Sequence, residues 1–193
     1  MARAVPLGQN GNVETPYRKR LRRREERCHW RYLTFSCHRR LQLLGNRAIR
    51  DLLVQSIANA RETCGFKLLA WVIMPEHIHM IIVSTRDEWP IPRILVAIKQ
   101  PVAQTVVRRW RRLGAPVIGR ITASDGRVRF WQAGGGFDRN VRDQDELTRE
   151  IEYIHRNPVR RGLAKEPTDW AWSSARWYAG ITEGQIPIDR DYR

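Results

Sequence analysis

Long apolar segments are absent from this chain of 193 residues. The longest unbroken apolar run, LLAWVIMP, is much shorter than the roughly 20 residues that cross a bilayer, so the sequence predicts no membrane-spanning helix. The residues before the first predicted strand contain no apolar stretch of the kind that directs secretion. We therefore expect a cytoplasmic protein with no membrane partner.

Cysteine is also scarce, and the three examples are Cys28, Cys37 and Cys64. An odd number of cysteines does not support a disulfide framework, and these three lack the close pairing that binds zinc. We interpret them as reduced thiols.

Acidic residues are few relative to basic ones: 20 Asp and Glu face 35 Lys and Arg, which leaves a net charge of +15. Arg greatly outnumbers Lys, and a guanidinium can bind a phosphate through two parallel N–H donors. The charge is concentrated in residues 18–27, 106–113 and 157–165. Because such clusters displace counterions from phosphates, nucleic acid is favoured as the partner over a membrane surface.

One domain is predicted over residues 28–180, between a flexible basic arm at 1–27 and a C-terminal tail at 181–193. Apolar periodicity predicts strands at 28–37, 66–74, 77–85 and 127–132, and helices at 46–62, 92–113 and 142–158. Pro101 is expected to kink or split the second helix, and the glycine-rich segment 133–138 is expected to be a flexible loop. The β-α-β-β-α-β order predicts an α+β fold, a ferredoxin-like antiparallel sheet with an added C-terminal helix.

Two histidines interrupt the apolar strand predicted at 77–85. His77 and His79 project to one side of that strand, whereas Ile78 and Met80 project to the other. Such a pair is either structural and hydrogen-bonded or part of a metal site. The pattern alone leaves both interpretations open.

The helix predicted at 142–158 begins with Asp143 as N-cap, and Glu146 is placed to complete a capping box. Its core face is marked by Leu147, Ile151 and Ile154.

Tyr153 and Asn157 fall about 40° apart on a flank of this helix away from its core face. Each also has an ordinary structural interpretation. The tyrosine can be a half-buried packing residue, and an Asn before Pro158 suits an N-cap at a helix break.

Several motifs together resemble the REP-associated tyrosine transposases, which are single-tyrosine HUH transposases of the IS200-like family. The specific pair is MPEHIH followed by YIHRNPVRRGLA. FWQ before the glycine-rich loop, RD-x-D-E-L at the start of the last helix, and DWAWSS after it are also similar to that family. The resemblance covers about residues 28–178.

The resemblance implies a role for each matching position. His77 and His79 correspond to the metal-binding pair, Asn157 to the third ligand and Tyr153 to the nucleophile. The implied cofactor is Mg²⁺ or Mn²⁺, and the implied substrate is single-stranded DNA beside a hairpin, cleaved through a 5′-phosphotyrosine intermediate. A tyrosine hydroxyl with a pKa near 10 is a weak nucleophile, so a Lewis acid on the phosphate is chemically reasonable.

Further expectations concern the partners. The DNA-binding residues are predicted from the basic clusters: Arg108, Arg109, Trp110, Arg111, Arg112, Arg160 and Arg161. Trp110 could instead cover the core, and Glu150 is interpreted as a solvated carboxylate, with assistance to the metal as the alternative. The protein is expected to be a monomer or homodimer in a bacterial cytoplasm, associated with the nucleoid when bound to DNA.

Two alternatives remain at this stage. One is a related HUH nuclease, a replication initiator or relaxase, which shares the chemistry. The other is a non-catalytic nucleic-acid-binding protein that keeps the fold and the charge.

Overall fold

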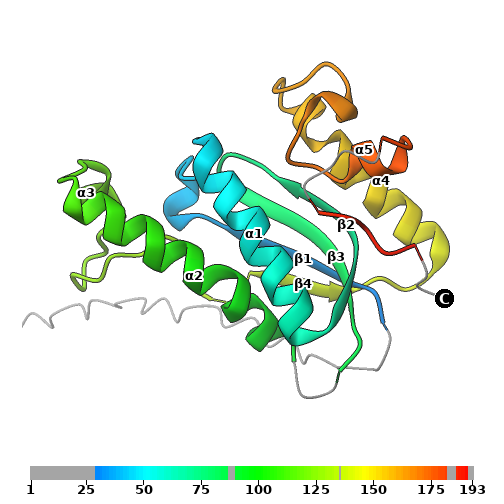
Figure 1. Ribbon diagram of the computed structural model, residues 1–193, viewed down its shortest axis with the longest axis horizontal. Coiled ribbons are helices and arrows are strands. Elements are labelled where there is room, and N and C mark those ends of the chain that lie inside the picture. Colours follow the sequence, from blue (N-terminus) through cyan, green and yellow to red (C-terminus); the bar gives the residue numbers. More distant parts are fainter. Residues whose placement is uncertain (1–28, 87–89, 135, 182–185, 191–193) are drawn as a thin grey trace, which may run out of the picture.

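The computed structural model describes residues 29–86, 90–134, 136–181 and 186–190 (Figure 1). The predicted basic arm and Cys28 lie outside these ranges. The elements in chain order are β1 (Arg31–Ser36), the 3-10 turn η1 (His38–Arg40), α1 (Arg47–Cys64), β2 (Phe66–Ile73), β3 (His77–Ser84), α2 (Ile91–Arg112), α3 (Val117–Ile121), β4 (Phe137–Asn140), α4 (Gln144–Arg160), the 3-10 turn η2 (Pro167–Asp169) and α5 (Ala175–Tyr178). Within the described ranges, no helix has the length and apolarity needed to cross a membrane.

The sheet has four antiparallel strands in the order β2-β3-β1-β4. The β2–β3 hairpin turns at Pro75 and Glu76, where the Met74 N–H donates to the His77 carbonyl at 2.8 Å. A β-α-β-β-α-β chain with this strand order is the predicted ferredoxin-like arrangement. The predicted α+β fold is therefore confirmed.

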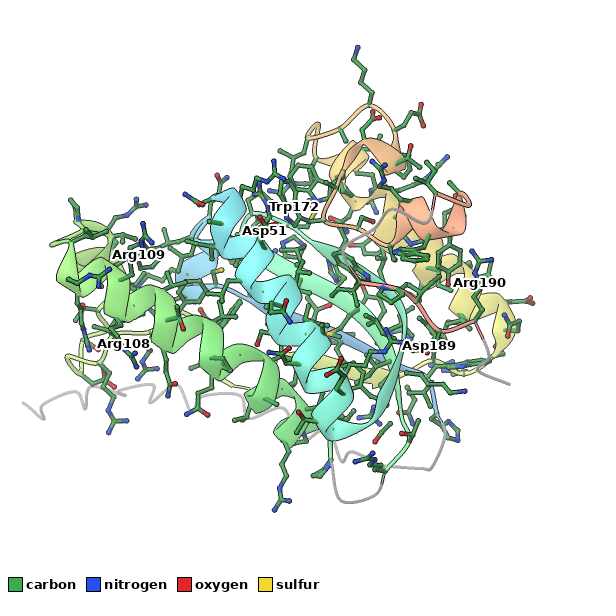
Figure 2. All side chains as sticks on the ribbon, in the orientation of Figure 1. Asp51, Arg108, Arg109, Trp172, Asp189 and Arg190 are labelled. Atoms are coloured by element: carbon green, nitrogen blue, oxygen red, sulfur yellow. The ribbon has the colours of Figure 1, made fainter. Side chains whose placement is uncertain are left out.

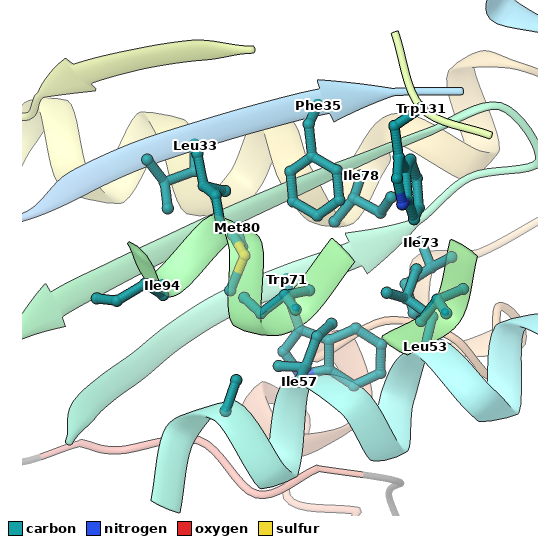
Figure 3. Close-up of a cluster of buried hydrophobic side chains, with 14 of the residues drawn as sticks. Leu33, Phe35, Leu53, Ile57, Trp71, Ile73, Ile78, Met80, Ile94 and Trp131 are labelled. Atoms are coloured by element: carbon teal, nitrogen blue, oxygen red, sulfur yellow. The ribbon is translucent and has the colours of Figure 1, made fainter. Parts of the chain in front are cut away.

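Helices α1 and α2 cover one face of the sheet, and α4 packs on the opposite face (Figure 1). Figure 3 shows the larger core, in which Ile78 and Met80 of β3 meet side chains from α1 and α2. Side chains alternate along a strand, so His77 and His79 project from β3 toward the α4 face. The smaller core on that face contains Ile81, Leu147 and Ile154.

The fourth strand differs from the prediction. Residues 127–132 make only isolated bridges, Cys37 with Trp131 and Thr122 with Val128. The strand that completes the sheet is instead β4, which begins inside the segment predicted to be a flexible loop.

Two contacts explain why the chain joins the sheet at β4. Gly136 has φ of +78°, and a Cβ there would lie 2.2 Å from the Thr34 carbonyl oxygen, so only glycine permits this close approach. One residue into the strand, the buried Asp138 carboxylate accepts two hydrogen bonds from Arg31, at 2.9 and 2.7 Å. A buried bidentate pair fixes the register more strongly than apolar alternation in a short strand.

Pro101 and Pro158 lie inside helices without ending them. Helix α2 is continuous across Pro101, so the predicted split is absent, because apolar residues on both sides of the proline, Ile98 and Val102, are fully buried. Helix α4 likewise runs through Asn157 and Pro158, so the alternative in which Asn157 caps a new helix at a break is wrong.

The described part of the predicted C-terminal tail packs on the domain. Ile186 is buried, and Asp189 both donates to and accepts from the Leu68 backbone, at 2.8 and 2.7 Å. Near the other end of α1, the Trp172 indole N–H donates to Asp51 at 2.9 Å (Figure 2). These contacts hold the chain after α4 against α1 and β2.

Candidate active site

The two histidines of β3 face each other at close range. Their Nε2 atoms are 3.0 Å apart, and the rings are nearly perpendicular, with centroids 4.7 Å apart. Both side chains are buried on the α4 face of the sheet.

The other nitrogen of each ring has its own partner. The His77 Nδ1–H donates to Glu76 Oε1 at 2.9 Å, which leaves a lone pair on Nε2. His79 Nδ1 lies 2.8 Å from Tyr32 Oη and 2.7 Å from Thr34 Oγ1, both on β1. Partners of this kind orient histidines that bind metals, so both Nε2 atoms are held toward one point.

The site keeps both imidazoles neutral. Burial lowers the pKa of His79 to about 3, and the neighbouring His77 and Arg40 contribute to the same shift. Burial also lowers the pKa of His77, although Glu76 opposes the shift. Neutral imidazole is the form that binds a metal ion.

The donor geometry fits a divalent ion. Two nitrogen ligands at right angles, each about 2.1 Å from an ion, would be about 3.0 Å apart, which is the observed Nε2–Nε2 distance. In the described ranges no three His, Cys, Asp or Glu residues gather as a metal group.

Tyr153 of α4 contacts this pair directly. Its ring lies edge-on to His79, with centroids 5.6 Å apart, while 40% of the residue stays exposed. The Arg160 guanidinium lies 5.0 Å from the centre of the same ring. The tyrosine is thus accessible from solvent and next to the histidines.

Asn157 lies one helical turn beyond Tyr153, and Arg161 one turn beyond Asn157. Residues at this spacing share one side of a helix. Tyr153 touches His79, and the Arg161 guanidinium donates to Glu76 at 2.8 Å, so both ends of this row meet the histidine hairpin. Asn157, between them in this row, is buried with 6% exposure. The fold therefore gathers the four predicted site residues, and their chemical roles remain predictions.

The carboxylates at the start of α4 have partners away from the histidines. Arg139 of β4 binds both Glu146 and Glu150, so Glu150 is held in a partly buried ion pair and is not simply solvated. Asp143 caps α4 as predicted, at 2.7 Å from the Glu146 N–H. Glu146 does not complete the capping box, because its other oxygen accepts from the Arg142 N–H at 2.7 Å.

The predicted DNA-binding residues fall into two groups. Arg160 and Arg161 border the tyrosine site, as described above. The other group occupies the far end of α2, near α3, and Figures 1 and 2 place that end at the opposite side of the molecule from α4. Its arginines are all exposed: Arg108, Arg109, Arg111 and Arg112.

Trp110 differs from the arginines around it. It is partly buried and stacks on Phe130, with centroids 5.7 Å apart and an angle of 25° between the rings. One face of the indole is therefore occupied by the core. Stacking of Trp110 on a DNA base stays a prediction, and it would have to use the part of the indole that does not contact Phe130.

No role is predicted from the sequence for several residues that support the site. Nothing in the sequence pattern separates Glu76, Tyr32 and Thr34 from the other residues of their strands and turns. Their polar groups are the available signal, but the role of Thr34 depends on the β1–β3 register, which pairs it with His79. Arg40 is a further example; it has φ of +52° in the turn η1 after β1 and lies close enough to lower the pKa of both histidines.

A curated relative and a solved structure show how far the similarity extends. The REP-associated tyrosine transposase of Escherichia coli (strain K12) is 26% identical over 160 residues, which cover 83% of this chain and 82% of that protein. A solved structure described as a REP-associated tyrosine transposase bound to a REP hairpin superposes with a TM-score of 0.64 at 23% identity, covering 87% of this chain and 88% of that one. The structural likeness agrees with the predicted fold.

A family model supplies the classification. The model described as Transposase IS200 like matches residues 27–124, which is just over half of the chain and includes the histidine hairpin. The resemblance inferred from the motifs is thereby confirmed. The matched family is one of transposases, which is the enzyme class that the motifs predict. The chain belongs to the IS200-like transposase family.

Proposed function

We propose that this protein is a DNA strand transferase that cleaves and rejoins single-stranded DNA beside hairpins, with Tyr153 as nucleophile. The observation that carries the proposal is the contact between Tyr153 and His79, at 5.6 Å between ring centroids, beside the facing nitrogens of His77 and His79. A nucleophile next to a pair of neutral imidazoles suits metal-assisted transfer of a phosphoryl group.

In this mechanism the Tyr153 oxygen forms a bond to the scissile phosphorus and loses its proton. The bond from phosphorus to the 3′ oxygen breaks, and that oxygen takes up a proton as a free 3′-hydroxyl. The DNA remains attached as a 5′-phosphotyrosine. Attack by a 3′-hydroxyl on this linkage restores Tyr153 and joins the strands, so no external energy source is required.

The cofactor we propose is Mg²⁺ or Mn²⁺, held by His77, His79 and the Asn157 side-chain oxygen. When bound, the ion polarises the scissile phosphate as a Lewis acid. Two imidazole ligands favour Mn²⁺ over Mg²⁺, which prefers oxygen. Glu76, Tyr32 and Thr34 keep the rings aimed at the site.

The substrate is inferred from charge as well as from similarity. The exposed arginines at the end of α2 suit the phosphates of a duplex stem, whereas Arg160 and Arg161 suit the strand at the tyrosine. The similar solved structure is described as bound to a REP hairpin, which supports a hairpin substrate here.

We also infer that Tyr153 serves the histidines of its own chain. The Arg161–Glu76 ion pair, at 2.8 Å, and the ion pairs of Arg139 with Glu146 and Glu150 attach α4 to its own sheet at both ends. A monomer then contains a complete site. In a domain-exchanged homodimer the Arg161–Glu76 pair would form between chains instead of within one chain.

A strand-exchange assay tests the proposal. A hairpin oligonucleotide with a labelled single-stranded flank is incubated with the protein and Mn²⁺, together with an unlabelled hairpin of different length. We expect cleavage and joined products of mixed length. Tight binding with neither product would favour the non-catalytic binding protein, whereas cleavage without joining would favour a nuclease.

A further inference from the structure

Phe137, the first residue of β4, lies exposed on the same face of the sheet as His77 and His79. It is 46% exposed, which is unusual for a phenylalanine in a strand. Its backbone is fixed on both sides, because Gly136 fits closely against Thr34 and Asp138 is tied to Arg31. The exposure is therefore a property of the folded edge strand.

The strand register connects Phe137 to the candidate active site. Phe137 pairs with Thr34 across β1 and β4, and Thr34 pairs with His79 across β1 and β3. Directly paired residues share a sheet face, and the bond from Thr34 to His79 Nδ1, at 2.7 Å, confirms which face it is. Phe137 thus lies two strands from His79, a separation of about 10 Å.

The surroundings leave one side of the ring available. The Tyr32 ring contacts Phe137 edge-on, with centroids 6.4 Å apart. The Arg139 guanidinium lies over the Tyr32 ring, 5.3 Å from its centre, and forms ion pairs with carboxylates of α4. Helix α4 packs mainly over β2 and β3, and it leaves Phe137, on the β1–β4 side of this face, 46% exposed.

We propose that Phe137 is a stacking platform for one unpaired base of the DNA strand that passes through the active site. The ligand is single-stranded DNA, and the position is about one or two nucleotides from the scissile phosphate, given the separation from His79. This inference rests on the proposed function for the location of the scissile phosphate. An exposed aromatic ring in a basic protein favours base stacking, which tolerates any base because every base has a π-face.

Equilibrium binding tests this role without chemistry. The probes are DNA stem-loops with a single-stranded extension of about eight thymidines, on the 5′ side in one and on the 3′ side in the other, measured in EDTA. Phe137→Ala and Phe137→Leu should weaken binding of one probe about fivefold to 150-fold, the usual range for losing one stacked base. Phe137→Tyr should bind as the native protein does, and Val96→Ala, at another exposed apolar residue outside the basic clusters, should have no effect.

An abasic scan locates the base. Each thymidine of the responsive probe is replaced in turn by an abasic site, and one position should cost the native protein as much as Phe137→Ala does. In Phe137→Ala the same replacement should cost nothing further, because the partner ring is gone. The proposal is overturned if Phe137→Ala or Phe137→Leu binds as tightly as the native protein, or if no single position shows this coupling. The binding measurement needs no cleavage, so it can still be interpreted if the strand-exchange assay fails. Failure of the proposed function and failure of the Phe137 proposal are therefore distinguishable.

Discussion

Glu76 Oε1 accepts a hydrogen bond from Arg161, the C-cap residue of α4, at 2.8 Å and another from His77 Nδ1 at 2.9 Å. Burial raises the pKa of Glu76, but Arg161 and His77 outweigh it, so the pKa lies below its usual value. The ionised carboxylate therefore joins the tyrosine helix to a proposed metal ligand.

Glu76→Gln should raise the Mn²⁺ concentration needed for half-maximal cleavage about tenfold to 100-fold, the usual effect of losing such a partner. The neutral amide loses the ion pair with Arg161 and no longer favours the required His77 tautomer. Titrating cleavage with Mn²⁺ measures the effect, and excess Mn²⁺ should restore most of the rate. Glu152→Gln, at an exposed carboxylate of α4 paired with Arg156, is the matched control and should titrate like the native protein. An identical titration for Glu76→Gln would show that Glu76 does not support the metal.

Removing the metal should stop cleavage and leave the protein folded. Excess EDTA should abolish cleavage by the native protein, and Mn²⁺ added back should restore it. The variant with both His77→Ala and His79→Ala should stay inactive at every Mn²⁺ concentration, with DNA binding in EDTA retained. Native cleavage that proceeds equally well in excess EDTA would mean that the histidine pair is structural.

The arginines at the end of α2 should contribute affinity but not chemistry. Replacing Arg108, Arg109, Arg111 and Arg112 by Gln should weaken hairpin binding and flatten the dependence of log Kd on log salt concentration, by about 0.9 for each phosphate that the variant no longer neutralises. Cleavage at saturating DNA should change little. The same four positions changed to Lys keep the charge, so that variant should retain the native slope. A native slope in the Gln variant would remove this surface from the binding site.

His155 should make stability depend on pH. It is buried, its Nε2 lies 2.9 Å from Ser174 Oγ, and burial lowers its pKa to about 4. Between about pH 6.5 and pH 4 the unfolded chain takes up a proton that the folded protein excludes, so stability falls as the pH falls through this window. The loss at pH 5 should be about 2 kcal/mol relative to pH 7.5.

Urea unfolding of the native protein and of His155→Gln at both pH values isolates this contribution. The variant is expected to be less stable at pH 7.5, but its further loss on going to pH 5 should be smaller by about 2 kcal/mol. Equal pH dependence in the two proteins would mean that His155 is protonated in the folded state.

The sequence predicted those parts of the fold that have strong local signals. The β2–β3 hairpin, the two long helices on one face and the cap at Asp143 follow from periodicity and turn chemistry. The fourth strand could not be predicted in this way, since β4 is short and depends on the close approach of Gly136 to Thr34 and on the distant Arg31–Asp138 pair. Long-range ion pairs leave no local pattern.

In the candidate site, too, residues with a local sequence signal were predicted and residues that depend on long-range contacts were not. His77, His79, Tyr153 and Asn157 carry spacing signals within one strand or one helix, and the motif resemblance connected the two. Thr34, Tyr32 and Phe137 depend on which strands pair and in which register. Trp110 and Glu150 depend on partners distant in sequence, Phe130 and Arg139. Local sequence patterns reveal neither the register in which strands pair nor which distant residues come into contact.

Covalent capture tests the central claim, that Tyr153 attacks DNA. The native protein is incubated with a labelled hairpin oligonucleotide and Mn²⁺ and then denatured, and the labelled species is digested and mapped by mass spectrometry. We predict a denaturation-resistant adduct on Tyr153. We also predict no adduct with Tyr153→Phe, although that variant should bind the hairpin with a Kd within about twofold of native, since only the nucleophilic oxygen is absent. An adduct formed by Tyr153→Phe, or native DNA attached to another residue, would contradict the claim.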